Sequence, residues 1–262
     1  MDALEDIAHW KTRIAVGRMA FDAGFYNQAA RHFRTALELL KNQEDPSSEL
    51  LSINSICLAK ALSCLGHYDE AELLINEALK IDTAHQENIL QLALDYLELS
   101  STCWKQHRQE QGETYAHKAL ELLNSLDKKE KENHTTSIAR ALKLIAIMKG
   151  ERGNYTEAIK TIDKALTTLE HSQEGSTSQA YGEALMVKVM LLVDKGEIEQ
   201  IESILGDAIQ IIELHKGIFH PQLARVMHAL AQHVKQSGKI DIGIALEKQA
   251  QEIEEKNRQG LY

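Results

Sequence analysis

Residues 66–81 read GHYDEAELLINEALKI, and this stretch decides the fold because related stretches recur along the chain. They begin at Gly24 (GFYNQAARHFRTALELL), at Gly153 (GNYTEAIKTIDKALTTL) and, more faintly, at Gly196 (GEIEQIESILGDAIQII). These glycines and Gly238 are about 42 residues apart, with a gap of about two periods where one copy lacks its glycine. A fixed period of this length predicts a repeat protein.

Each copy predicts a pair of antiparallel helices joined at the glycine. Twelve residues after the glycine position every copy has an alanine: Ala36, Ala78, Ala119, Ala165, Ala208 and Ala250. Mostly small residues also occur seven positions before the glycine (Gly17, Ala59, Ser100, Ala146, Val189, Ala231) and five after it (Ala29, Ala71, Gly112, Ala158, Ile201, Gly243). Small side chains at these offsets let two helices approach closely, while Phe33, Ile75, Ile162 and Leu205 fill the space beside them. The glycine suits the left-handed residue that ends the first helix.

The third copy departs from this pattern at its turn. Gln106 is predicted to occupy the glycine position, and the aromatic residue that follows the glycine as Tyr26, Tyr68 and Tyr155 is missing. We therefore expect an irregular turn in this repeat.

The order of small residues, turn glycine, aromatic residue, alanine and Ala-Leu pair resembles the tetratricopeptide repeat family. The longer period, and the run KGIFHPQLARVMHALA from Lys216, are similar to the kinesin light chain type of this repeat. The resemblance implies an all-α fold, a right-handed α-solenoid (superhelix) of about six helical hairpins in a single domain over residues 1–262. The approximate repeats are 8–42, 46–83, 86–126, 135–171, 178–216 and 220–258.

Composition and charge restrict the function. A net charge of −10 argues against a general nucleic-acid-binding surface, which needs an excess of Lys and Arg. The N-terminal stretch carries acidic residues and no long apolar run, so neither a secretory signal nor membrane insertion is expected. Three cysteines without close pairing are typical of reduced thiols, and we expect a cytoplasmic location.

No catalytic motif is recognisable in the sequence. It contains no nucleophile elbow, no glycine-rich phosphate loop and no His-Glu-x-x-His zinc motif. The twelve histidines are scattered, and only His228 and His233 approach a ligand spacing on one helix. We therefore expect no enzyme activity, no metal site and no cofactor.

The first helix of each repeat lines the concave groove in arrays of this kind, and this resemblance supplies the candidate binding residues. They are Lys11, Arg18, Phe21, Lys60, Trp104, Lys105, Arg140, Lys143, Met186 and Met190. Their basic bias in an acidic chain favours a protein or peptide partner that carries carboxylates. Two alternatives stay open at this point: the cations pair with acidic residues on neighbouring helices, and the two methionines belong to the core.

The function that we predict is a non-catalytic scaffold or adaptor that binds a peptide or protein segment in this groove. The alternative is a peptide-sensing regulatory protein, which would act through a separate effector because the first repeat starts near Trp10. Self-association into a homo-oligomer through the terminal repeats is left open.

Overall fold

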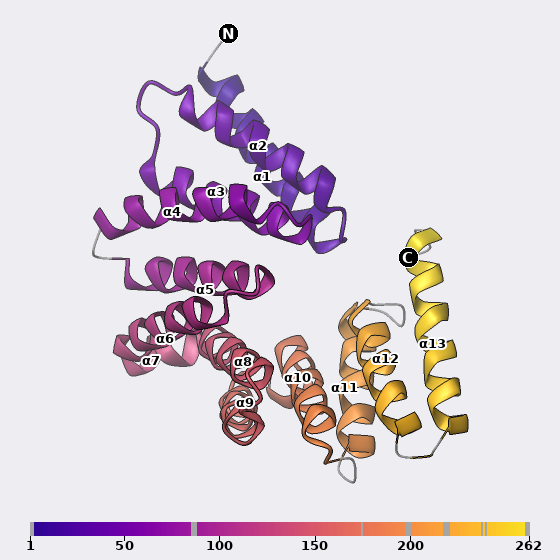
Figure 1. Ribbon diagram of the computed structural model, residues 1–262. Helices are drawn as coiled ribbons and strands as arrows, with labels where there is room; N and C mark the ends of the chain where they lie inside the picture. The colour runs from indigo at the N-terminus through magenta and orange to yellow at the C-terminus, as the bar shows by residue number, and fades with distance from the viewer. Residues whose placement is uncertain are drawn as a thin grey trace. The chain divides into compact units, whose positions relative to one another are not determined.

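The computed structural model describes residues 3–84, 88–173, 175–197, 201–216, 221–236, 238 and 240–259 (Figure 1). Across these residues the ordered structure is helical, with no β-strand. The chain divides into two compact units, Met1–Asp127 and Lys128–Tyr262. The predicted all-α fold built from helical hairpins is confirmed.

The first unit consists of three hairpins in its described part, and the two helices of each hairpin pack side by side (Figure 1). Repeat one is α1 (Ala3–Asp22) with α2 (Tyr26–Lys41), repeat two is α3 (Ser48–Cys64) with α4 (Tyr68–Ala84), and repeat three is α5 (Ile89–Lys105) with α6 (Gln109–Ser125). The second helix of one repeat packs on the first helix of the next, as α2 does on α3 and α4 on α5.

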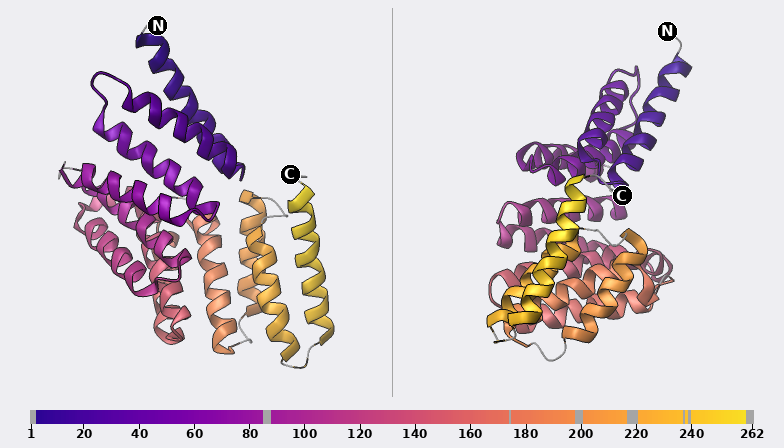
Figure 2. Two further views of the ribbon diagram at one scale, coloured as in Figure 1. Left: turned by 45° about the horizontal axis from the view of Figure 1, so that its top comes forward. Right: turned by 90° about the vertical axis from the view of Figure 1, so that its right-hand side faces the viewer.

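The second unit repeats this arrangement. Its described helices are α7 (Lys128–Asn133), α8 (Thr135–Glu151), α9 (Tyr155–Glu170), α10 (Gln179–Lys195), α11 (Ile201–Lys216), α12 (Pro221–Gln236) and α13 (Ile240–Gln259), with a short 3-10 turn at Gly175–Thr177. The long helices form the pairs α8/α9, α10/α11 and α12/α13. Figure 2 shows the last four helices standing next to one another in its left view. None of the helices that the structure describes is long and apolar enough to span a bilayer.

The predicted positions of small residues form the seams between helices. All of them are buried, from Ala29, Ala71 and Ala158 after the turn to the six alanines of the repeat, each of which is 0% exposed. The larger residues Phe33, Ile75, Ile162 and Leu205 are buried beside them, as predicted. Close helix contact in each hairpin therefore depends on side-chain size at a few fixed positions.

The turns follow one backbone pattern in every described repeat. Gly24, Gly66, Gly153, Gly196 and Gly238 all have a left-handed φ between 77° and 87°. In repeat two, for example, the His67 N–H donates to the Leu62 carbonyl at 3.0 Å, which closes the end of α3. The predicted role of these glycines is confirmed.

The prediction for the third turn is wrong by one residue. His107, not Gln106, occupies the left-handed position, with a φ of 59°, and it is also the residue that lies twelve before Ala119. The turn is also regular, because the Arg108 N–H donates to the Cys103 carbonyl at 2.8 Å just as His67 does to Leu62. Histidine tolerates this backbone region at some cost in free energy, so hairpin geometry overrides local preference here.

Candidate partner-binding faces

All ten predicted binding residues lie on the first helices of their repeats. In the first unit α1 contacts α3 and α3 contacts α5, and in the second unit α8 contacts α10 and α10 contacts α12. Each unit therefore has its own row of first helices. The first row carries Lys11, Arg18, Phe21, Lys60, Trp104 and Lys105, and the second carries Arg140, Lys143, Met186 and Met190.

Lys60 lies at the centre of the first row. Its Nζ is 5.9 Å from the centroid of the Phe21 ring on α1, a distance that allows a cation–π contact. The same Nζ is 3.6 Å from Oε1 of Glu98 on α5. Lys60 on α3 thus connects all three first helices of the unit while its side chain remains 40% exposed.

Two further cations lie near Lys60. Arg18 on α1 is exposed and lies close enough to the Cys57 thiol on α3 to favour its charged form. Lys105 Nζ donates to the Ser63 hydroxyl at 3.2 Å, which joins the end of α5 to the end of α3. We call Arg18, Phe21, Lys60 and Lys105 the basic face of the first unit.

The neighbouring thiol does not cancel this positive charge. Burial raises the pKa of the Cys57 thiol, and the nearby charges of Arg18 and Lys60 oppose this effect without reversing it. The thiol is therefore neutral near pH 7. The carboxylate of Glu98 pairs with Lys60 on this face, and its side chain is only 10% exposed.

The two remaining candidates of the first unit lie differently. Lys11 is exposed near the middle of α1, and its Nζ is 5.5 Å from the centroid of the buried Trp10 ring. Trp104 is half-buried, one residue before Lys105. The structure thus brings Arg18, Phe21, Lys60 and Lys105 together and holds Lys11 against another aromatic ring.

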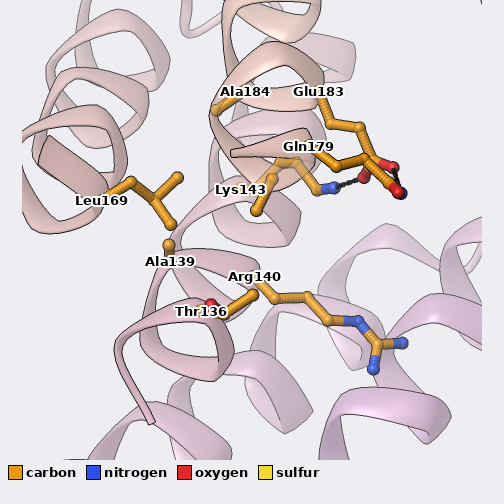
Figure 3. A pocket seen from close by; sticks show the side chains of 9 residues that line it. Thr136, Ala139, Arg140, Lys143, Leu169, Gln179, Glu183 and Ala184 are labelled. Carbon is orange, nitrogen blue, oxygen red and sulfur yellow. Dashed lines mark hydrogen bonds and ion pairs between the residues drawn. The ribbon is translucent and has the colours of Figure 1, made fainter. Parts of the chain in front are cut away.

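A pocket of about 300 Å³ lies on the first-helix row of the second unit (Figure 3). Its walls come from α8, the end of α9 and α10, and its lining residues include Thr136, Ala139, Arg140, Lys143, Leu169 and Glu183. Small apolar side chains line much of it, and charged groups stand at its edge.

An ion pair neutralises one cation of this pocket. Lys143 Nζ is 2.7 Å from Glu183 Oε2, and Gln179 Nε2 donates to Glu183 Oε1 at 2.8 Å. The Arg140 guanidinium lies apart from this network (Figure 3). Pairing with a neighbouring first helix thus accounts for part of the basic bias in both units, since Lys60 and Lys143 each contact a glutamate.

The two methionines have different environments. Met186 is 3% exposed and belongs to the hydrophobic core of the second unit, whereas Met190, one turn later on α10, is 37% exposed. A partner could therefore reach Met190, but Met186 contributes to packing.

Sequence reasoning missed a buried acidic pair in the first unit. Asp82 on α4 is 5% exposed and Asp95 on α5 is 0% exposed, although neither was identified as a candidate in the sequence. A signal was present: Asp82 stands sixteen residues after Gly66, where four other repeats have Leu40, Leu123, Leu169 and Ile212, all fully or almost fully buried.

The described residues contain no group of three or more His, Cys, Asp or Glu side chains that could hold a metal ion. His228 Nε2 instead lies 3.3 Å from Glu254 Oε1. The chemistry that these faces offer is charge pairing, hydrogen bonding and apolar contact with another molecule.

Paired helices joined by left-handed turns define a helical-repeat protein. Residues 11–84 match the model of the tetratricopeptide repeat family, so the resemblance seen in the sequence is confirmed for this segment. No curated protein sequence matches the chain.

Solved structures extend the likeness to almost the whole fold. A Rap protein complexed with competence and sporulation factor is similar with a TM-score of 0.71 and 16% identity, covering 96% of this chain and 76% of that one. The Rap conjugation gene regulator of plasmid pLS20, in complex with the Phr* peptide, also has a TM-score of 0.71, at 10% identity and coverages of 97% and 76%. A putative kinesin light chain with TPR-like repeats from Podosopora anserina has a TM-score of 0.57 and 15% identity, with coverages of 82% and 99%. At these identities the likeness concerns the fold.

Proposed function

We propose that this protein is a non-catalytic interaction scaffold that binds a segment of a protein partner on the basic face of the first unit. The observation that carries the proposal is that Arg18, Lys60 and Lys105 come from three successive first helices to one face. Arg18 and Lys60 both lie near Cys57, and Lys60 and Lys105 both lie near Cys64. Lys60 also contacts the Phe21 ring. The chain as a whole has a net charge of −10, so this local excess of cations runs against its composition.

The chemistry of the face indicates the class of partner. Carboxylates of the partner would pair with the cations, and an apolar side chain would lie against Phe21. Successive packed helices are roughly 10 Å apart, and an extended chain advances about 3.3 Å per residue, so a segment of about six residues could contact all three first helices. The similar Rap regulator that was solved with the Phr* peptide supports a peptide as the ligand.

The proposal is tested by reversing charges on the basic face. Binding of a captured partner and of synthetic peptides is then measured. Affinity capture from the native cell supplies the partner, and labelled acidic peptides containing Glu and Leu, or basic ones containing Lys and Leu, serve as defined probes. We expect the double variant Lys60→Glu/Lys105→Glu to weaken binding of the partner and of the acidic peptide about tenfold or more, which corresponds to about 1.4 kcal/mol.

The matched control is Lys41→Glu/Lys80→Glu, which changes the net charge equally on exposed lysines of the second helices α2 and α4. It should leave affinity within about twofold, because long-range charge effects are screened at physiological salt. Equal losses in the two double variants, or tighter binding of the basic peptide, would refute the proposed face.

The second candidate function is a peptide-sensing regulator that acts through a separate effector. It is favoured by the structural likeness to the two Rap proteins, one solved with competence and sporulation factor and the other with the Phr* peptide. The two candidates differ in linkage: in a regulator, peptide bound to the basic face changes the affinity for an effector bound elsewhere, and the effector changes peptide affinity by the same factor. Direct competition for one face indicates a scaffold.

A further inference from the structure

The seam between repeats two and three is unusually polar. Most of the buried polar residues that the structure describes lie on α3, α4 and α5, including Ser52, Asn54, Asp82, Asp95, Glu98 and Ser100. In the second unit, by contrast, the helices pack through a continuous apolar core that includes Ile162, Leu169 and Leu192. An apolar seam holds over a wide pH range, whereas a seam containing carboxyl groups depends on their protonation.

Two buried carboxyl groups occupy positions that are apolar in several other repeats. Asp82 replaces the buried leucine or isoleucine of four other repeats; the last repeat has Glu254 there. Asp95 stands twelve residues before His107, where the second unit has the buried Ala141 and Ala184. Both carboxyl groups are thus taken out of water at a contact between α4 and α5, which pack directly on each other.

The hydrogen bonds of this pair leave a buried oxygen of Asp95 without a donor. The Ser52 hydroxyl on α3 donates to Oδ2 of Asp82, and Gln91 Nε2 donates to Oδ1 of Asp95 at 3.1 Å. Oδ2 of Asp95 is buried and accepts no hydrogen bond. A protonated Asp95 could use this oxygen as a donor, and the neighbouring carboxylate of Asp82 could accept its hydrogen bond.

We propose that the seam between repeats two and three is a proton-dependent joint, in which one proton held between Asp82 and Asp95 keeps α4 packed against α5. With the proton present, an O–H of one carboxyl group donates to the other carboxylate. Without it, two negative charges face each other in a region that excludes water, and the seam opens.

The negative charges around Asp95 also favour its protonated form. Burial, followed by the hydrogen bond and the negative charge of Asp82, raises the pKa of Asp95 to about 8, and Glu98 on the same helix contributes further negative charge. The Gln91 amide opposes this shift, and α3 presents the uncharged Ser52 hydroxyl to the pair. Lys60 on α3 pairs with Glu98.

The direction of the pH effect follows from proton linkage. The pKa of Asp95 is about 8 in the folded protein and ordinarily 3.8, so between these values the closed seam holds a proton that the opened seam releases. The stabilisation is complete below the ordinary pKa and is lost as the pH rises to about 8. Over this window the equilibrium constant for opening should increase up to about tenfold per pH unit and then become constant.

Hydrogen–deuterium exchange of the full-length protein tests this joint between pH 5 and 9, after correction for the intrinsic exchange rate. We expect amides of α4 and α5 to lose protection about tenfold per pH unit up to about pH 8, while amides of α8 and α9 in the second unit do not follow this trend. The Asp95→Asn variant should remove the pH dependence at α4 and α5, and Asp22→Asn, at an exposed position on α1, should retain it.

An infrared measurement keeps the proposal falsifiable if Asp95→Asn does not fold. With carbon-13 aspartate incorporated into the wild-type protein, the carbonyl band of a protonated carboxylic acid should be present at pH 6.5 and disappear through about pH 8. Absence of this band at pH 6.5, or an unchanged pH dependence of exchange in a folded Asp95→Asn protein, would overturn the proposal.

Discussion

His107 shows what the hairpin demands of a single residue. Its backbone has a left-handed φ of 59° where five other repeats have a left-handed glycine, and its turn has the same hydrogen bonds as the turns at Gly24, Gly66, Gly153 and Gly196. An L-residue in this region costs roughly 1–2 kcal/mol, while glycine adds entropy to the unfolded chain. We predict that His107→Gly raises the free energy of unfolding by about 0.5–1 kcal/mol, measured by urea denaturation of the full chain.

The control for this substitution is His67→Gly, at the residue that directly follows the turn glycine of repeat two. His67 does not have a positive φ, so glycine relieves no strain there. It only gives the unfolded chain more conformational freedom, which should lower the free energy of unfolding. If both variants lost stability, the strain assigned to His107 would be absent.

Individual residue types in the sequence predict the backbone conformation of this protein well, but they do not predict which carboxyl groups are buried. Glycine at a left-handed position can be recognised locally, since few other residues adopt that conformation. Asp82 and Asp95 could not be recognised as a pair, because their contact exists only once α4 packs on α5. Without knowledge of its neighbours, an aspartate in a sequence is expected to have a solvent-exposed side chain.

At the scale of the helix, side-chain volume determines how closely two helices pack. A Cβ atom added to Gly17 on α1 would lie 2.7 Å from the ring of Phe33 on α2, and that ring is 1% exposed. We predict that Gly17→Ala lowers the free energy of unfolding by about 1–3 kcal/mol despite the higher helix propensity of alanine. Thermal and urea denaturation provide the measurement.

Gly206 on α11 provides the matched control, because a Cβ atom added there meets nothing within 4 Å. Gly206→Ala should therefore show the propensity effect alone and raise stability by about 0.5–1 kcal/mol. Destabilisation by both substitutions would argue against close packing as the reason for glycine at position 17.

The helices could be predicted from the repeat, but the interactions between their polar faces could not. Lys143 and Glu183 are 40 residues apart, and the repeat pattern places both on first helices without indicating that they meet. Only the distance between neighbouring first helices decides whether such a pair forms or whether the cations face a partner. For the same reason, Phe21 and Lys60 were predicted as candidates individually, while the contact between them required the structure.

At the scale of the whole molecule, one face carries positive charge although the net charge of the chain is negative. The chain carries 39 acidic and 29 basic residues, yet Arg18, Lys60 and Lys105 lie together on the basic face of the first unit. An acidic overall charge repels acidic molecules at long range, so binding of a carboxylate-rich segment would depend on short-range contacts with this face. The proposed specificity thus arises from local placement, which composition alone cannot reveal.

The division into two compact units predicts which helices a destabilising substitution affects. Ile75 on α4 and Ile162 on α9 occupy equivalent repeat positions and are 1% and 0% exposed. Truncation of either to alanine leaves a cavity that costs about 2–5 kcal/mol. In repeat proteins stability comes from each repeat and its immediate neighbours, so Ile162→Ala should increase hydrogen exchange in α8–α11 and leave α1–α4 protected, whereas Ile75→Ala should do the reverse. A uniform loss of protection along the chain in both variants would instead indicate that the whole molecule unfolds as one cooperative body.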